Sequence, residues 1–439
     1  MVAYFLKHHG MRVTVLERDS RPGGTMRTIH QDGWLVEAGP NSALETTPLF
    51  QQVFRDIGIA DQVVYANEAS NNRYILRGGR LHVLPMNPVA FLRSRLWSWR
   101  GKLRLLKEPF IGRADKPETV AEFVSRRLGR EFHEYAIDPF VAGVYAGKTD
   151  QLSVQAAFPK LHALEEKYGG LVKGMVMGRG ERRRRVEKAK DRARLFSFVN
   201  GMQTFPAALA VTLGEALQLN TTVHRVERRG RGYAIEFTKE GQVGHIVGDV
   251  LVLSVPSYAA SELVKPLDAE FAGRLVSIYY PPVTEVFLGF RAGQVGRPLD
   301  GFGFLVPTKE NRKILGTIWS SAILAGRAPE GCVALTTFVG GAHQPELALE
   351  SDSTLLDVVS TELQSIMGVK GSPVYASINR WQRAIPQYEL GHTELLKAMI
   401  DFEQEFPGLY LCANYRGGIS VGDCMVSAER TASRLLQTA

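Results

Sequence analysis

Three glycine-containing loops carry the polar groups most suited to binding a nucleotide. Arg21-Pro-Gly-Gly24 forms a turn, Glu37-Ala-Gly-Pro-Asn-Ser42 forms a second tight loop, and Gly408 to Asp423 reads as a buried strand, a glycine loop and a helix that begins near Asp423. A helix N-terminus behind glycines offers free N–H groups to a phosphate, whereas the acidic Asp423 favours a hydroxyl-rich partner. Each loop also has a purely structural interpretation as a turn, with Asp423 as an N-cap.

A carboxylate at the end of a strand adds a further candidate. Val2, Phe5 and Leu6 have helical spacing, Gly10 stops that helix, and Arg12 to Glu17 reads as a buried strand. In a dinucleotide-binding fold the strand after the first helix ends in Glu or Asp, because a carboxylate there accepts hydrogen bonds from the adenosine ribose. The preceding strand and G-x-G-x-x-G loop are absent, so we expect that the chain starts inside the first helix, through a misplaced start codon or a truncation.

Composition limits the class of protein. The 439 residues suggest about three domains' worth of chain, and 45% hydrophobic with 22% charged residues excludes a disordered or collagenous protein. Three scattered cysteines are too few for a disulfide framework or a zinc site, which favours a reducing, cytoplasmic location and no metal. No apolar run approaches the ~20 residues of a membrane-spanning helix.

The net charge of +8 is concentrated in two segments. Residues 91–113 contribute +6 and residues 181–194 contribute +5, so the other 402 residues sum to −3 and we expect no nucleic-acid partner. The first segment mixes its cations with Trp97, Trp99 and several leucines, a composition typical of a helix lying at a lipid surface. It predicts peripheral contact with an anionic membrane, against the alternative that the apolar residues pack inward. For the second segment a solvated face is favoured.

The remaining elements follow from periodicity and capping. Thr119-Val-Ala-Glu122 is a capping box that opens a helix through about Leu128, within a helical stretch that reaches roughly Leu195. Residues 220–248 read as a β-meander, and Asp249 to Pro256 reads as a continuous strand buried on both faces. Four antiparallel strands are expected at 283–290, 303–306, 314–319 and 333–339. The pattern predicts an α/β nucleotide-binding fold interrupted by a helical insertion and by a second, antiparallel sheet.

The C-terminal segment resembles the closing flavin motif of the protoporphyrinogen oxidases, within the amine-oxidase-like flavoenzyme superfamily. Thr14-Val-Leu-Glu17 with Arg21-Pro-Gly-Gly24 resembles the start of that superfamily. Asp138 to Gly147, and Ala384-Ile-Pro-Gln-Tyr388 with Gly391-His392, resemble segments characteristic of the protoporphyrinogen oxidases themselves. The resemblance covers nearly the whole chain and departs from the family only in the absent G-x-G-x-x-G loop.

The resemblance implies a Rossmann-like FAD-binding domain, an antiparallel-sheet substrate domain and the helical insertion. The implied FAD-binding parts are 1–72, 196–265 and 381–439, the substrate parts are 73–90 and 266–380, and the insertion is 91–195. It also implies noncovalent FAD, because Asn41, Tyr415 and Cys424 give no compelling attachment site. The residues implied to contact FAD are Glu17, Gly24, Thr25, Gly39, Pro40, Asn41, Ser42, Val223 through its backbone, Ile419, Ser420, Val421 and Asp423.

The implied substrate is a porphyrinogen. Arg73 matches the family's arginine that pairs with a propionate, which a guanidinium fork can hold bidentately. Leu171, Leu315 and Phe338 are candidates for the flat apolar walls. The implied reaction is oxidation of protoporphyrinogen IX to protoporphyrin IX by three hydride transfers to FAD, with dioxygen as acceptor and hydrogen peroxide as product.

The resemblance assigns no protein side chain as a catalytic residue, because the cofactor carries the chemistry. Two alternatives are open: oxidation of coproporphyrinogen III by the same chemistry, and a flavin-free remnant that binds porphyrin without oxidising it. A homodimer is also open.

Overall fold

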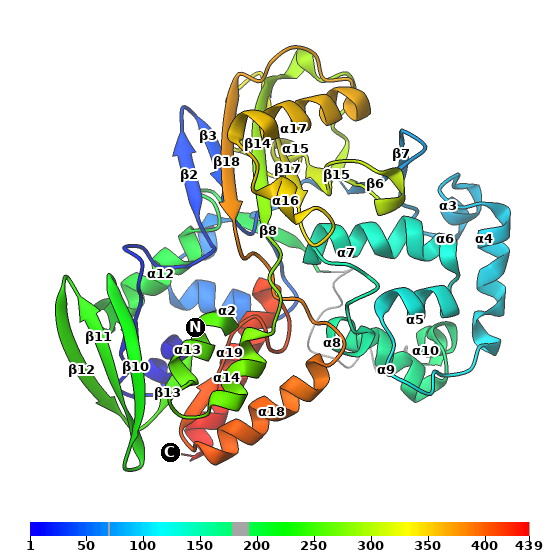
Figure 1. The fold of residues 1–439 in the computed structure, drawn as a ribbon. Helices are drawn as coiled ribbons and strands as arrows, with labels where there is room; N and C mark the ends of the chain where they lie inside the picture. The colour runs from blue at the N-terminus through cyan, green and yellow to red at the C-terminus, as the bar shows by residue number, and fades with distance from the viewer. Residues whose placement is uncertain (69–70, 178–192, 439) are drawn as a thin grey trace.

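The computed structural model describes residues 1–68, 71–177 and 193–438. Figure 1 shows a mixed sheet at the top, a group of helices at the right, and the two chain ends together with a small meander at the lower left. The chain is therefore a mixed α/β fold, as the sequence predicted. Most of the basic run expected at 181–194 lies outside the described residues.

The residues predicted to form the FAD-binding parts, 1–72, 196–265 and 381–439, are together called the nucleotide-binding part. It contains two short pairs of parallel strands. β1 (Val15–Leu16) pairs with β9 (Leu217–Gln218), and β13 (Leu251–Leu253) pairs with β19 (Leu409–Leu411). The strand expected at 249–256 is thus confined to three residues. Two of these are only half-buried, so the expected burial on both faces is wrong.

The helices of this part pack around an aromatic core. Helix α1 (Val2–His8) buries Val2, Phe5 and Leu6, as its periodicity predicted. Buried phenylalanines fill the core between these elements: Phe50, Phe54, Phe196, Phe198 and Phe205. Elements that contribute to this core include α2 (Leu49–Asp56), α12 (Thr204–Leu213), α19 (Val421–Thr438), β4 (Ala43–Leu44), β5 (Val63–Tyr65) and β8 (Leu195–Phe198). The same part of the chain also contains β2 (Thr28–Gln31), β3 (Trp34–Glu37), η1 (Ala60–Gln62) and η5 (Gly214–Ala216).

The predicted meander is confirmed. β10 (Thr221–Arg229), β11 (Gly232–Lys239) and β12 (Gln242–Gly248) form an antiparallel sheet, with a β-bulge between Val223 and Arg225. Three helices complete the core beneath it: α13 (Ser257–Val264), α14 (Ala269–Val276) and α18 (His392–Glu405).

The large sheet has seven strands in the order β18-β14-β17-β16-β15-β6-β7. The expected antiparallel strands are present, but β15 also pairs in parallel with β6, so the sheet is mixed. The strands are β6 (Asn72–Arg77), β7 (Arg80–Val83), β14 (Val283–Arg291), β15 (Gly301–Leu305), β16 (Gly316–Ile318), β17 (Cys332–Gly340) and β18 (Tyr375–Trp381). Its short helices are η6 (Ala292–Gln294), η7 (Thr308–Glu310), α15 (Ser320–Ile323) and α16 (Pro345–Ala348).

The two faces of β14 serve different parts of the molecule. Val286, Leu288 and Phe290 pack beneath helix α17 (Asp352–Met367). Phe287 packs on Trp34 of β3, on the opposite face. Because strand side chains alternate, Glu285 also faces the nucleotide-binding part.

The helical insertion begins differently from the sequence expectation. Residues 91–113 form no single interfacial helix, but short pieces that include α3 (Pro88–Arg93), α4 (Trp99–Arg104) and η3 (Leu105–Phe110). The capping box Thr119–Glu122 is confirmed and opens α5 (Val120–Arg127). The rest comprises α6 (Arg130–Phe132), the π-helical turn η4 (His133–Ile137), α7 (Asp138–Tyr145), α8 (Val154–Ala157), α9 (Pro159–Tyr168) and α10 (Leu171–Met177). Leu195 itself lies in strand β8, which contradicts a helical stretch reaching that residue.

A bilayer-spanning helix was not found in the described parts of the chain, where every helix is too short or too polar to cross a membrane.

Candidate active site

The predicted nucleotide-binding residues gather at the carboxyl ends of the parallel strands. Glu17 directly follows β1, is half-buried, and its Oε1 accepts a hydrogen bond from the N–H of Asp19 at 2.9 Å. The N–H of Thr221 bonds the carbonyl of Glu17 at 2.8 Å, which places the start of β10 beside it. Val223 stands at the β-bulge, where the regular ladder is interrupted. This arrangement suits the expected contacts of Glu17 with a ribose and of the Val223 backbone with an adenine.

The two N-terminal loops approach each other closely at Gly39. A Cβ built on Gly39 would lie 1.9 Å from the carbonyl oxygen of Thr25, so only glycine fits between the loops. Next to this contact, the N–H of Ala38 bonds the carbonyl of Arg27 at 2.8 Å. Gly24 and Thr25 are exposed, while Pro40, Asn41 and Ser42 are half-buried, the last three following Gly39 in sequence. The structure therefore brings the two predicted loops together.

Helix α19 begins at Val421, with Asp423 in its first turn, which confirms the expected helix start near Asp423. Ser420 caps the helix: its Oγ accepts the N–H of Asp423 at 3.1 Å and donates to Oδ2 of Asp423 at 2.6 Å. The local signal was Ser420 three residues before an acid, a capping-box spacing. A Cβ on Gly422 would lie 2.4 Å from Oγ1 of Thr46, so this helix end packs directly against the chain that follows Ser42.

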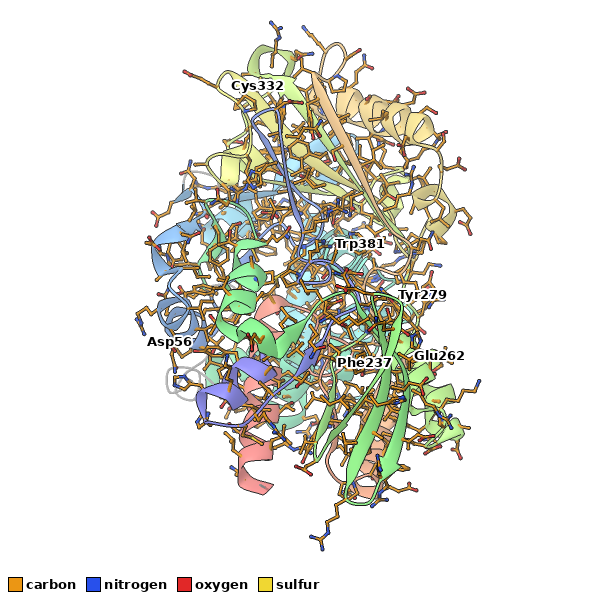
Figure 2. All side chains as sticks on the ribbon, turned by 90° about the vertical axis from the view of Figure 1, so that its left-hand side faces the viewer. Asp56, Phe237, Glu262, Tyr279, Cys332 and Trp381 are labelled. Atoms are coloured by element: carbon orange, nitrogen blue, oxygen red, sulfur yellow. The ribbon has the colours of Figure 1, made fainter. Side chains whose placement is uncertain are left out.

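Buried donors without partners lie on three segments around these loops. Among the described residues, Ser257 Oγ, Trp381 Nε1 and Tyr415 Oη are buried and have no hydrogen-bond partner. They follow or end the strands β13, β18 and β19. Figure 2 shows Trp381 where the large sheet meets the nucleotide-binding part, while Cys332 marks the outer end of the sheet. Because buried polar groups are normally satisfied, these three donors are exceptions. The glycine loops, where two backbone segments approach each other closely, fit the binding of a nucleotide cofactor such as FAD.

Two buried acids beside the loops were missed by sequence reasoning. Glu37 accepts hydrogen bonds from Thr28 Oγ1 at 2.7 Å and from the N–H of Met202 at 2.9 Å, and lies 3.9 Å from Arg327. Burial raises the pKa of Glu37 to about 7. Burial, and then the charge of Glu37, raises the pKa of Glu285 well above its usual value. A single acid within the otherwise apolar stretch Val283–Phe290 was the available signal.

Glu285 links the large sheet to the predicted flavin loop. The backbone N–H of Gly39 lies near its carboxylate and opposes the rise in its pKa, and Oε2 is buried without a hydrogen-bond partner among the described residues. A small cavity between the two parts is lined by Glu37, Asn41 and Ser42 on one side and by Phe302 and Phe287 on the other. The loop and the sheet thus face each other across a shared space.

Arg73 does not line this cavity itself, but it lies next to Phe302 on the sheet side of the cavity. It is exposed on β6, and its guanidinium carbon lies 6.0 Å from the ring centre of Phe302, which lines the cavity. Within the described residues, no hydrogen bond or ion pair holds the guanidinium. It is therefore available to a ligand carboxylate.

Two of the three predicted apolar wall residues lie together. The N–H of Leu315 bonds the carbonyl of Phe338 at 2.8 Å, and both side chains pack against Ala142 of α7 and Ala146, which directly follows α7. Leu171 instead belongs to the core of the helical insertion, where its N–H bonds Oε1 of Glu108 at 2.7 Å. The structure does not bring Leu171 together with Leu315 and Phe338, because Leu171 begins α10 and packs in the core of the insertion.

Comparison with known proteins gives a consistent result. Residues 1–436 match the family of flavin containing amine oxidoreductases. The chain is 31% identical over 465 residues to protoporphyrinogen oxidase 2, chloroplastic/mitochondrial, of Arabidopsis thaliana, covering 99% of this chain and 91% of that protein. It is 28% identical over 443 residues to coproporphyrinogen III oxidase of Bacillus subtilis (strain 168), covering 98% and 93%. A crystal structure of a candidate protoporphyrinogen oxidase from Exiguobacterium sp. 255-15 is similar with a TM-score of 0.82 at 24% identity, covering 100% and 96%.

Proposed function

The chain belongs to the flavin-containing amine oxidoreductase family, and we propose that it is an FAD-dependent oxidase that converts protoporphyrinogen IX to protoporphyrin IX. The observation that carries the proposal is the similarity to protoporphyrinogen oxidases over 99% of the chain, combined with an exposed arginine whose guanidinium lies 6.0 Å from the ring of Phe302. When bound, FAD accepts hydride from the substrate and passes electrons to dioxygen, which yields hydrogen peroxide. The protein supplies binding, orientation and exclusion of water.

Different residues of the chain bind the cofactor and the substrate. Glu17, the Gly39–Ser42 loop, Val223 and the Ile419–Asp423 segment hold the cofactor. Burial raises the pKa of the Cys424 thiol to about 12, so the thiol stays protonated, in keeping with noncovalent FAD. Leu315 and Phe338 provide an apolar surface for the macrocycle, and Arg73 orients it by one propionate.

Substrate choice is tested by product analysis. Protein loaded with FAD should oxidise protoporphyrinogen IX, with three dioxygen molecules consumed for each porphyrin formed. The similarity to the coproporphyrinogen III oxidase of Bacillus subtilis makes coproporphyrinogen III the second candidate substrate. Specificity constants for both porphyrinogens, measured by porphyrin fluorescence, distinguish the two functions. Absence of turnover with either one would contradict the proposal.

Arg73→Ala should raise KM for the porphyrinogen by about 10- to 100-fold and leave the FAD content unchanged. The lost charge-assisted pair is worth roughly 1.5 to 3 kcal/mol. Arg73→Lys should recover only part of the loss, because an ammonium cannot form the bidentate fork. Steady-state kinetics would measure both effects, with Arg80→Ala, an exposed arginine on the neighbouring strand β7, as the control. An unchanged specificity constant in Arg73→Ala would remove this residue from the substrate site.

The protein acts at an anionic membrane surface, in a cytoplasmic location. Its helical insertion exposes large apolar side chains close together in sequence: Trp99 is 65%, Leu106 is 69% and Phe110 is 89% exposed. Arg93, Arg95, Arg100, Lys107 and Arg113 are exposed beside them. Such a mixture favours lipid contact through apolar insertion and attraction to anionic headgroups.

Not every residue expected at the lipid surface is available. Leu96 and Trp97 are buried, and Trp97 stacks on Phe132 with ring centres 4.6 Å apart. Lys102 donates to the carbonyls of Leu92 and Ser94 and is buried. The interface therefore depends on Trp99 rather than on both tryptophans.

Liposome flotation tests this interface. The wild-type protein should float with vesicles containing anionic lipid at low and physiological salt, because apolar insertion resists screening. The triple variant Trp99→Ser, Leu106→Ser, Phe110→Ser keeps every cation and should lose the salt-resistant part of the binding. The control pair Val243→Ser and Val247→Ser removes exposed apolar groups from β12 and should change nothing. A wild-type protein that stays at the bottom of the gradient at low salt would refute membrane contact.

A further inference from the structure

The hydroxyl group of Tyr388 forms hydrogen bonds with two separate residues of the C-terminal glycine loop. Tyr388 lies between β18 and α18 and is only 3% exposed. Its hydroxyl donates to the carbonyl of Asn414 at 2.6 Å and accepts the N–H of Gly418 at 3.0 Å. Its ring stacks on His392, with centres 4.2 Å apart and planes 12° apart. Burial raises the pKa of Tyr388, so the hydroxyl keeps the proton that it donates.

Arg416 shapes the first half of the loop: its N–H bonds the carbonyl of Ala413 at 3.0 Å and its Nη1 bonds the carbonyl of Leu411 at 3.2 Å. Neither bond reaches the Gly418 end of the loop. The loop runs between β19 and α19 without regular secondary structure, and Gly418 has φ +128°, a conformation that other residues rarely adopt. A Cβ on Gly418 would also lie 2.5 Å from the carboxyl group of Asp423. Without the hydroxyl, a backbone carbonyl and a backbone N–H would each lose a hydrogen bond in a half-buried place. The Tyr388 hydroxyl is thus a specific determinant of this loop.

Tyr388 also contacts the helical insertion, through backbone hydrogen bonds and through packing of its ring. Its carbonyl accepts the N–H of Ser153 at 2.8 Å, and the N–H of Leu390 bonds the carbonyl of Gln151 at 3.1 Å. Its side chain belongs to the hydrophobic core of the insertion, against which Ile419 of the loop also packs. Next to it, Gln387 Nε2 donates to the carbonyl of Tyr145, at the end of α7, at 2.7 Å.

We propose that Tyr388 is a positioning residue that holds the Asn414–Gly418 loop in its flavin-binding shape and fastens it to the helical insertion. The inference rests on the proposed function, because it assumes that this loop contacts FAD. It assigns no chemical step to the tyrosine. The hydroxyl acts through the backbone of the loop, so the loop should already have this shape before the cofactor binds.

The test compares two phenylalanine variants in the full-length protein. Tyr388→Phe removes the hydroxyl but keeps the ring on His392. Tyr233→Phe is the matched control, because Tyr233 is fully buried and its hydroxyl donates to the carbonyl of Pro407 at 3.0 Å, away from the loop. For each protein, the flavin is removed and the Kd for FAD, the visible circular dichroism of the bound flavin and the apoprotein Tm are measured.

The expected result is a Kd for FAD about tenfold higher in Tyr388→Phe, with an altered flavin dichroism, while Tyr233→Phe binds FAD as the wild type does. Both apoproteins should show a similar fall in Tm. Unchanged Kd and dichroism in Tyr388→Phe, or equal changes in both variants, would overturn the inference and leave the proposed function standing. A wild-type protein that does not bind FAD would overturn both.

Hydrogen exchange on the wild-type protein gives a second measurement that needs no variant. The amide of Gly418 should be protected in the apoprotein nearly as well as in the FAD-loaded protein, because Tyr388 is its acceptor in both. Rapid exchange of this amide until FAD is added would show that the cofactor, rather than the tyrosine, orders the loop, and would overturn the inference.

Discussion

Gly39→Ala should reduce the affinity for FAD by at least ~100-fold, about 3 kcal/mol. The new methyl group would lie 1.9 Å from the carbonyl oxygen of Thr25 and 3.0 Å from its carbonyl carbon. Both atoms belong to the backbone, so no flexible side chain can move aside and the loops must separate. Overpacking of this kind typically costs 1 to 3 kcal/mol of stability as well. Because the N–H of Gly39 lies near the carboxylate of Glu285, the separation would also disturb the contact with the large sheet.

Flavin content after purification and the Kd of the apoprotein for FAD measure this effect. The control is Gly273→Ala in helix α14, where a Cβ would meet no atom within 4 Å. That change should leave FAD binding untouched and add up to ~1 kcal/mol of stability, since alanine is the better helix former. If Gly39→Ala binds FAD with wild-type affinity, the Gly39–Ser42 loop does not hold the cofactor.

Arg127→Met should lower the free energy of unfolding by about 3 to 5 kcal/mol, the usual cost of removing one partner from a buried ion pair. Arg127 and Glu108 are both fully buried, and Nη1 of Arg127 lies 3.3 Å from Oε1 of Glu108. Nε of Arg127 donates to Glu165 at 2.7 Å. The Glu108 carboxylate also accepts the N–H groups of Leu171 and Val172, at 2.7 and 3.0 Å.

Loss of the guanidinium would leave the buried Glu108 without its cation, while Glu165 keeps Arg126 at 2.9 Å, and would weaken the start of α10. Urea unfolding, followed by circular dichroism, measures the change. Arg274→Met is the matched control: its exposed i,i+4 pair with Glu270 should contribute less than ~1 kcal/mol. A loss below ~1 kcal/mol in Arg127→Met would show that the buried network contributes little to the stability of the insertion.

Local elements were predictable where a short-range signal suffices. The capping box at Thr119, the apolar face of α1 and the meander at 220–248 all depend on residues a few positions apart, and each is present in the structure. The family and its FAD cofactor were predictable for a similar reason, since the resemblance depends on contiguous motifs near Glu17, Tyr388 and Asp423. The individual residues expected to contact FAD and the substrate stay predictions.

The sequence predictions were wrong where the local residue pattern does not determine which side chains are buried. Trp97 and Trp99 are two residues apart and equivalent in composition, yet one stacks on Phe132 and the other is exposed. Leu171 reads as any apolar helix residue, but Glu108, 63 positions earlier, binds its N–H and fixes it in the helical core. Neither outcome can be read from periodicity, because each depends on a partner distant in sequence.

The sequence by itself therefore determined the family, the cofactor and those local elements that depend on short-range signals. Only the tertiary structure decided which charged side chains lie next to one another and which residues form hydrogen bonds to the predicted flavin-binding loops. Glu37, Glu285 and Arg327 come together from separate parts of the chain, and Tyr388 reaches Asn414 and Gly418 across 26 and 30 positions. The physical reason is that hydrogen bonds and buried charges act over a few ångströms in space, whatever the distance along the chain.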